Sequence, residues 1–428
     1  IKWTPTGTYS TVEFHYSTDN FASSNILIGQ ASNSASGVQG TYPWTIPTNL
    51  LSDTVRVRVR DAADPDVKSI SAYDLKLVGG LTVTAPNTQT PLIVWYKGES
   101  QDINWTATGV VDTVNIDYSI NGGTGWTNIV TGEAGYTAGS NTKTITVPDE
   151  NSENCLVRVS DTGHAASVYS VSTYPFAMRP VITVTQPAQD ANFVVGSNNN
   201  TIAWSLNGST KVSYVKLYYS KDAGPFNNDI DVTGSIPANQ PYIWNNIPDA
   251  ISGDVKVRVV ANSNANVFGT SPSFNIIGAF TIQQPDASQN WLVGSTDKNI
   301  TWLYKGSMGT ADIFYKYGAG SYASIASGVS IGTGGSGSWN WPSIPDSVSN
   351  SVQVKIASTG NPTEEFGESA IFKIRGGFSN LRVEDAGNNP VNVLQSGDSY
   401  NIKWSTTGSA IANVILEFSS NNGSSWSY

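Results

Sequence analysis

The chain has 428 residues, of which 39% are hydrophobic and only 13% are charged, with a formal net charge of −10. An acidic balance argues against nucleic acid as a partner, because binding the phosphate backbone needs a basic face. No apolar run approaches the roughly 18 residues of a membrane helix, so we expect no membrane segment in this fragment. A single cysteine excludes an intrachain disulfide. A surface of Ser, Thr, Asn and Gly is typical of an extracellular β protein.

The chain opens on a short stretch, IKWTPTG, that returns near its end as IKWSTTG. The pattern Ile-x-Trp occurs at five places, and its tryptophans, Trp3, Trp105, Trp204, Trp302 and Trp404, stand 98 to 102 residues apart. Self-similarity at a fixed period indicates a repeat architecture. We therefore expect these tryptophans to be core residues of successive copies.

Further predicted elements follow each tryptophan in a constant order. An alternating run such as Val12–Tyr16 or Val114–Tyr118 predicts a half-buried strand, and a polar turn with Asn or Gly predicts a hairpin. A strand ending in Pro comes next, as in KTITVP, and a Val-x-Val-x-Val run follows. Cys155 stands in such a run where other copies have valine, which predicts a small buried hydrophobe.

Each complete copy offers about seven short strands without a helical period, which predicts an all-β fold of tandem immunoglobulin-like or fibronectin III-like antiparallel β-sandwiches. We number the copies unit 1 to unit 5: residues 1–79, 80–179, 180–278, 279–376 and 377–428. The connections between them are short, so we expect neighbouring units to touch and to form a stiff rod. Units 1 and 5 look incomplete. We expect either that the natural chain continues or that identical subunits complete these ends.

Unit 2 carries the stretches INWTATG, VNIDYSINGGTGWTNI, TVP and LVRVSD. This combination resembles the Ig-like repeats of large bacterial secreted and surface proteins. It is also similar to the Ser/Thr-rich Ig-like domain of fungal GPI-anchored cell-wall proteins. The resemblance covers the whole chain as tandem copies and implies extracellular, structural or adhesive roles. It brings no catalytic residues, because its motifs are core and turn positions.

The sequence offers no catalytic constellation, so we expect no enzyme. The two histidines, His15 and His164, belong to different units and are expected at the surface. No nucleophile-elbow, zinc-protease or phosphate-loop pattern is present.

Two ligand hypotheses remain open, and neither requires a cofactor. The loop DAADPD places Asp61, Asp64 and Asp66 between two strands, where carboxylate oxygens could hold calcium, although the pattern favours a solvated acidic loop. Exposed aromatics can stack on sugar rings, and Trp95 and Trp339 are the candidates for carbohydrate binding. Glycosylation sequons stand at Asn104, Asn199, Asn207, Asn299 and Asn422.

These patterns favour a structural role. We expect a segment of a long extracellular or cell-surface protein that forms a stalk, fibre, filament or surface coat, with lateral self-assembly open. The alternative is an array of adhesive or carbohydrate-binding modules.

Overall fold

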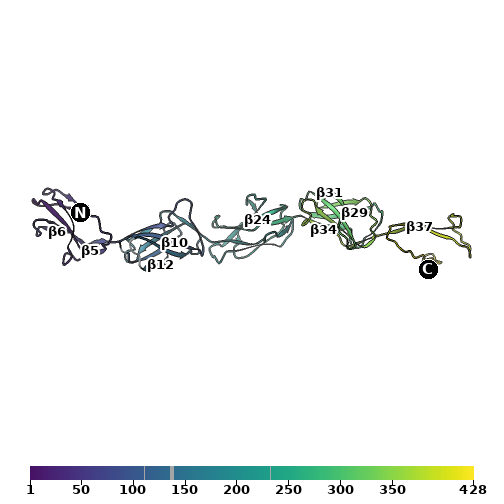
Figure 1. The fold of residues 1–428 in the computed structure, drawn as a ribbon, viewed down its shortest axis with the longest axis horizontal. Helices are drawn as coiled ribbons and strands as arrows, with labels where there is room; N and C mark the ends of the chain where they lie inside the picture. Colours follow the sequence, from purple (N-terminus) through teal and green to yellow (C-terminus); the bar gives the residue numbers. More distant parts are fainter. Residues whose placement is uncertain (110, 135–138, 232) are drawn as a thin grey trace.

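The computed structural model describes residues 1–109, 111–134, 139–231 and 233–428. The five units follow one another in a row, with the two ends of the chain at opposite ends of an elongated molecule (Figure 1). None of the described residues forms a helix, so none belongs to a helix able to cross a membrane. Each sheet takes its strands from one unit only. The all-β fold class predicted from the sequence is confirmed.

The strands of unit 1 form a two-stranded sheet, β1-β4, and a larger sheet, β3-β2-β5-β6, in which β7 also pairs with β5. Their bounds are β1 Lys2–Trp3, β2 Thr11–Ser17, β3 Ile26–Ser32, β4 Gly40–Thr41, β5 Ser52–Asp61, β6 Lys68–Ile70 and β7 Leu75–Leu77. Unit 5 contains the antiparallel pair β36 (Gly377–Glu384) and β37 (Asn401–Thr407).

Unit 2 is a two-sheet sandwich, with orders β13-β10-β8 and β12-β11-β14-β16-β9, and β15 pairs with β14. The bounds are β8 Gly80–Ala85, β9 Val94–Tyr96, β10 Ser100–Thr108, β11 Thr113–Ser119, β12 Thr127–Ala134, β13 Gly139–Thr146, β14 Ser152–Asp161, β15 Tyr169–Val171 and β16 Phe176–Arg179. All pairs are antiparallel except β16 with β9.

Unit 3 repeats this plan with sheets β17-β19-β23 and β18-β26-β24-β20-β21, and β22 and β25 pair with β20 and β24. The bounds are β17 Thr183–Gln186, β18 Asn192–Val194, β19 Asn200–Ser205, β20 Tyr214–Lys221, β21 Asn228–Asp229, β22 Ile236–Pro237, β23 Tyr242–Trp244, β24 Ser252–Ala261, β25 Phe268–Thr270 and β26 Phe274–Ile277.

Unit 4 has sheets β27-β29-β32 and β28-β35-β33-β30-β31, with β34 paired to β33. The bounds are β27 Ala279–Gln284, β28 Asn290–Leu292, β29 Lys298–Lys305, β30 Thr310–Tyr317, β31 Ala323–Ser330, β32 Ser336–Trp341, β33 Ser349–Ser358, β34 Phe366–Glu368 and β35 Phe372–Arg375.

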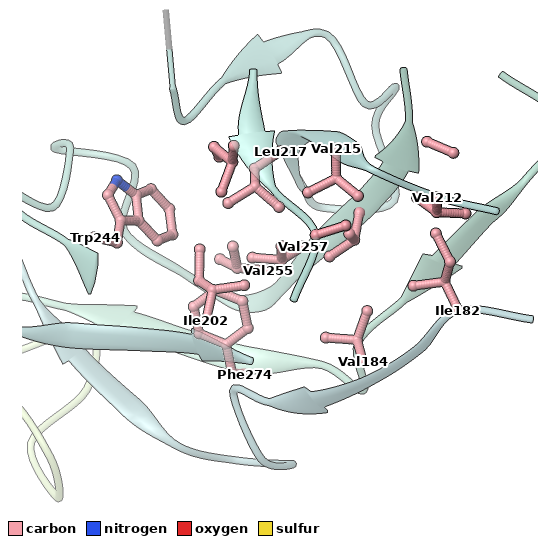
Figure 2. Close-up of a cluster of buried hydrophobic side chains, with 14 of the residues drawn as sticks. Ile182, Val184, Ile202, Val212, Val215, Leu217, Trp244, Val255, Val257 and Phe274 are labelled. Atoms are coloured by element: carbon pink, nitrogen blue, oxygen red, sulfur yellow. The ribbon is translucent and has the colours of Figure 1, made fainter. Parts of the chain in front are cut away.

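The alternating runs supply the cores, because successive side chains of a strand point to opposite faces. Figure 2 shows the core of unit 3, where side chains of both sheets meet. Its centre includes Ile202, Leu217, Val257 and Phe274, each at most 1% exposed. Cys155 is fully buried in the core of unit 2, so the prediction of a small buried hydrophobe is confirmed.

The repeat tryptophans fill the cores to different degrees. Trp105 and Trp302 are at most 1% exposed, whereas Trp3, Trp204 and Trp404 are partly buried. The Trp302 Nε1–H donates to Ile331 O at 3.0 Å, and the Trp204 Nε1–H donates to Ala238 O at 2.9 Å. The indole thus packs its ring and still pairs its one donor.

A serine that caps a core strand also recurs in four units, partly buried in unit 1 and buried in units 2, 3 and 4. The backbone N–H groups of four core strands donate to serine hydroxyls at 2.9–3.1 Å: Val57 to Ser71, Val157 to Ser172, Val257 to Ser271, and Val354 to Ser369. Each bond satisfies a strand N–H where the neighbouring strands are short.

Candidate functional site: the junctions between units

The junctions are the places where side chains of different units meet. On one side lies the turn that follows the Pro-ended strand. In units 2, 3 and 4 an aspartate comes directly after that proline: Asp149, Asp249 and Asp346. The residue after each aspartate donates its N–H to the proline carbonyl at 2.8–3.1 Å. This three-residue turn presents the aspartate side chain to the following unit.

On the other side lies the loop after the Ile-x-Trp strand of the next unit. A glycine of positive φ begins the turn at each of four junctions: Gly109, Gly208, Gly306 and Gly408. A Cβ on Gly306 would lie 2.9 Å from Ile251 Cδ1 and 3.1 Å from Val195 Cγ2, both in unit 3. Glycine is required there by the backbone angle and by the close approach of the two units.

The aspartate and this loop form what we call the Asp clasp. Asp149 accepts hydrogen bonds from the Ser209 hydroxyl at 2.6 Å and from the Thr210 N–H at 2.9 Å. Asp249 accepts from the Ser307 hydroxyl at 2.5 Å and from the Ser307 N–H at 3.0 Å. Charge-assisted bonds of this kind are short and among the stronger ones in proteins.

The third clasp has fewer hydrogen bonds than the first two, and the pKa of the aspartate is lowered in the first. Asp346 accepts one hydrogen bond, from the Ser409 N–H at 2.7 Å. Partial burial opposes ionisation of Asp149, but the hydrogen bonds from Ser209 and Thr210 outweigh it and hold the pKa of its carboxyl below the ordinary value. The clasp therefore carries a negative charge at neutral pH.

The junction between units 1 and 2 lacks a carboxylate at this position. Thr48 follows the proline there, and a Cβ on Gly109 would lie 3.1 Å from Thr48 O. The backbones thus approach as closely as elsewhere. The residue after Gly109, Val110, lies outside the described residues.

A second set of contacts comes from the loop that follows the Val-x-Val-x-Val strand. We call it the back loop, because it reaches to the preceding unit. In unit 3 the Asn264 amide donates to Glu153 Oε1 at 2.7 Å and to Asn151 Oδ1 at 2.9 Å, both in unit 2. Glu153 also forms an ion pair with Arg179 at 2.7 Å. The hydrogen bond from Arg179, chiefly, lowers the pKa of Glu153, with burial opposing it.

The back loop of unit 4 makes a different contact. Glu365 is 3% exposed and accepts a hydrogen bond at 2.8 Å from the N–H of Gly278, at the end of unit 3. Gly253 and Ile277 stand where Glu153 and Arg179 stand one unit earlier, and a cavity of about 560 Å³ lies beside them. A glycine and an isoleucine in place of the charged pair line that space.

The back loop of unit 2 carries a histidine. His164 Nδ1 lies 2.8 Å from Asp161 Oδ2 in the same loop, and its Nε2 lies 3.6 Å from Asp53 Oδ1 in unit 1. The hydrogen bond with Asp161, together with the charges of Asp161 and Asp53, raises the pKa of His164. His164 is therefore a partly exposed residue of the junction between units 1 and 2.

The structure corrects the sequence-based placement of His15. Its residue is 4% exposed, so the expectation of a surface histidine is wrong. In β2 it lies opposite Leu27 of β3 and Arg58 of β5, and Arg58 lies over the Phe21 ring. Burial, followed by the nearby guanidinium groups, lowers the pKa of His15.

The predicted sugar-binding tryptophans are placed differently from each other. Trp95 is 3% exposed and packs on Phe176, with ring centroids 4.4 Å apart, so its expected exposure is wrong. The strand β9 that carries it lies at the edge of its sheet, but the Trp95 side chain belongs to the core of unit 2. Trp339 is partly buried against the core of unit 4. Carbohydrate binding at Trp339 stays a prediction.

The acidic loop of unit 1 is the equivalent of the back loops. Asp61 Oδ1 accepts the Ala63 N–H at 3.3 Å, and Asp64 Oδ1 accepts the Asp66 N–H at 3.0 Å. Within residues 1–109, 111–134, 139–231 and 233–428, no three His, Cys, Asp or Glu side chains form a group that could hold a metal ion. Calcium at this loop stays a hypothesis from the sequence alone.

The sequons also differ in exposure. Asn104 is partly buried, and its Oδ1 is buried. The side chains at the other four sequons are exposed: Asn199, Asn207, Asn299 and Asn422. Asn207 lies in the loop beside the first Asp clasp, where its carbonyl accepts a hydrogen bond from Lys97 Nζ at 3.1 Å.

The Asp clasp was missed from the sequence, although a signal exists. Three units share Pro-Asp at the same phase, and the next units share Gly-Ser or a similar pair after the tryptophan strand. The sequence position of the Pro-Asp pair does not show that it contacts the Gly-Ser pair of the next unit. That contact becomes visible only when the two units are placed next to each other.

No family model and no curated protein matches the chain. Among solved structures, it is similar to a tetra-tandem repeat from the extending region of a large adhesion protein: 14% identity, 85% of this chain and 92% of that chain covered, TM-score 0.31. It is also similar to the D1–D4 ectodomain fragment of ICAM-5: 10% identity, 77% and 99% covered, TM-score 0.30. A third is Drosophila OTK, extracellular domains 3–5: 9% identity, 69% and 97% covered, TM-score 0.25. These neighbours are multi-domain chains from adhesion or extracellular proteins.

Proposed function

We propose that this chain is a structural segment of a long extracellular multi-repeat protein, in which it acts as a stalk, fibre, filament or surface coat. The observation that carries the proposal is the Asp clasp, which joins consecutive units at three junctions with the same side chain at the same phase. A chain of sandwiches without such contacts would bend freely at short linkers. Fixed contacts instead hold the distance between the two ends. An extracellular location and a bacterial source, which the sequence resemblance implies, belong to the same proposal.

The chemistry of the molecule supports a mechanical role. Three titratable or nucleophilic side chains have been described above. His15 lies in unit 1, His164 lies in the back loop of unit 2, and Cys155 lies in the core of unit 2. Short polar contacts join units to one another at three junctions. These contacts stabilise the connection between consecutive units.

Lateral association with identical subunits is part of the proposal. The edge strands β3 and β31 are seven and eight residues long and carry no charged residue and no proline. Exposed edges of this kind pair readily with other strands, because their backbone groups are unpaired on one side. Sedimentation velocity tests this directly. Substituting lysine at Gln30 of β3 and at Ser327 of β31 should abolish any association.

The decisive experiment measures how straight the 428-residue chain is in solution. Small-angle scattering of the wild-type chain should give an elongated particle, and D249A should shorten its maximum dimension because one junction bends. D297A is the matched control, since Asp297 pairs with Lys298 inside unit 4. A wild-type chain as compact as a globule, or as flexible as D249A, would overturn the proposal.

A further inference from the structure

The junction between units 1 and 2 differs chemically from the later ones. Its back loop carries His164, with one carboxylate facing each ring nitrogen. Asp161 Oδ2 belongs to the same loop, and Asp53 Oδ1 belongs to β5 of unit 1. These two carboxylates are the charged groups that face the ring.

The protonation state of the ring decides how many carboxylates it can serve. An imidazolium has two N–H donors, whereas a neutral imidazole has one donor and one acceptor. The Nδ1 contact at 2.8 Å is the shorter, so Asp161 keeps the single N–H when the ring is neutral. The Nε2 lone pair then faces the Asp53 carboxylate. Two electron-rich groups at that position repel each other.

The loop is built to stay in place while the ring changes charge. Asp161 Oδ1 accepts the Gly163 N–H at 3.1 Å, and the Asp161 N–H donates to Val168 O at 2.9 Å. The Val168 N–H in turn donates to His164 O at 2.8 Å. Loss of the proton therefore acts on the contact with unit 1 and leaves the loop intact.

The later junctions have no titrating group at this position. Asn264 and Asn361 stand at the position of His164, and each of their carbonyls accepts the same kind of loop hydrogen bond. The later junctions also have an Asp clasp, where the first has Thr48. No clasp carboxylate at the position of Thr48 therefore holds units 1 and 2 together when His164 loses its charge.

We propose that the junction between units 1 and 2 is a pH-dependent hinge, closed when the His164 imidazolium bridges Asp161 and Asp53 and released when the ring is neutral. The hinge goes beyond the proposed structural role, because it does not depend on which function the chain serves. The sign follows from the bridge. A raised pKa means that the stabilisation is present at low pH and is lost as the pH rises through the pKa of His164.

Distances between spin labels on two units test the hinge. In a C155V background, which places the valine found in other units at that position, labels on Thr41 and Thr142 report on units 1 and 2. Labels on Thr142 and Thr201 report on units 2 and 3 as the control pair. All three threonines are exposed. The first pair should give a narrow distance distribution at about pH 5.5 and a broad one at about pH 8.5, while the control pair stays unchanged.

H164N is the matched variant, because asparagine occupies this position in units 3 and 4. It should remove the pH response of the first pair. Retention of the response in H164N, or an equal response in the control pair, would overturn the hinge.

Nuclear magnetic resonance of the imidazole rings gives a second measurement that needs no labels. D53N should lower the pKa of His164, because one of its two carboxylate partners becomes neutral, whereas His15 in the same spectra should be unaffected. An unchanged His164 titration in D53N would show that Asp53 does not contact the ring in solution, and the hinge would then be wrong.

Discussion

The second and third junctions, between units 2 and 3 and between units 3 and 4, share an Asp clasp and a glycine of positive φ but differ in their back-loop contacts. In both, the aspartate of the clasp accepts hydrogen bonds from a serine hydroxyl and from a backbone N–H. Around the second junction lies a network of Asn264, Glu153 and Arg179. At the third, Gly253 and Ile277 replace the charged pair, and the buried Glu365 reaches the backbone of Gly278.

The comparison separates what a junction requires from what it tolerates. The positive-φ glycine recurs at all four junctions and the clasp at three of them, so these are the features that the junctions share. The back-loop chemistry varies between histidine, asparagine and glutamate partners. If the proposed hinge holds, variation at that second contact gives the first junction a pH response that the later ones lack.

The largest effect should come from the glycine of the third junction. G306A adds a Cβ at positive φ, which costs about 1–2 kcal/mol. The same Cβ would crowd Ile251 and Val195, which adds about 1–3 kcal/mol or separates the units. G294A is the matched control, because Gly294 has φ +79° and open space around its Cβ. Calorimetric unfolding should show a greater loss for G306A, and equal losses would mean that the units do not touch there.

A smaller loss is expected from the ion pair beside the second junction. R179A leaves Glu153 with Asn264 as partner, and the loss should be about 1 kcal/mol because the pair is partly exposed. The wild-type advantage should shrink at high salt. R158A is the control, since Arg158 pairs with Asp117 inside unit 2. Label distances between units 2 and 3 should broaden in R179A only. Broadening in both variants would place the effect in unit 2 itself.

The two histidines should give pH responses of opposite sign. His15 is buried with a lowered pKa, so its contribution to stability is intact above the unfolded-state value near pH 6.5 and declines as the pH falls below it. H15F, which follows Phe314 at the same register of unit 4, should remove the acid sensitivity of unit 1. Denaturant unfolding at several pH values checks this. A wild-type unit 1 equally stable at low pH would contradict the burial of His15.

Much of the fold could be predicted because burial in a strand has period two. The Val-x-Val-x-Val runs gave their core positions directly, and Cys155 followed from the valines around it in phase. The same rule failed at His15 and Trp95. His15 alternates along β2 with the core residues Phe14 and Tyr16, but Arg58 lies opposite it on the neighbouring strand and Phe21 packs on Arg58. Trp95 belongs to a three-residue strand, too short for alternation to show which face it presents.

The candidate site was harder to predict because its contacts join different units. Asp249 and Ser307 are 58 residues apart and lie in separate sandwiches. Their bond depends on the angle at the junction, and that angle depends on Gly306 and Gly278. Sequence phase marks each residue as repeated. It does not show that the end of one unit faces the start of the next.

The smallest expected effect comes from moving the titrating group to a new junction. N264H places a histidine at the position of His164, facing Glu153 in place of Asp53. The second junction should then gain a pH response in label distances, closing at low pH. The response should be weaker than at the first junction, for two reasons. Arg179 already neutralises Glu153 and disfavours a second positive charge, and the Asp149 clasp holds the units together even when the ring is neutral.

Combining N264H with D149A removes that second restraint, so the double variant should respond more strongly than N264H alone. An equal response in both would show that the clasp does not restrain the junction. The view that the clasp holds the units together while the back loop responds to pH would then be wrong.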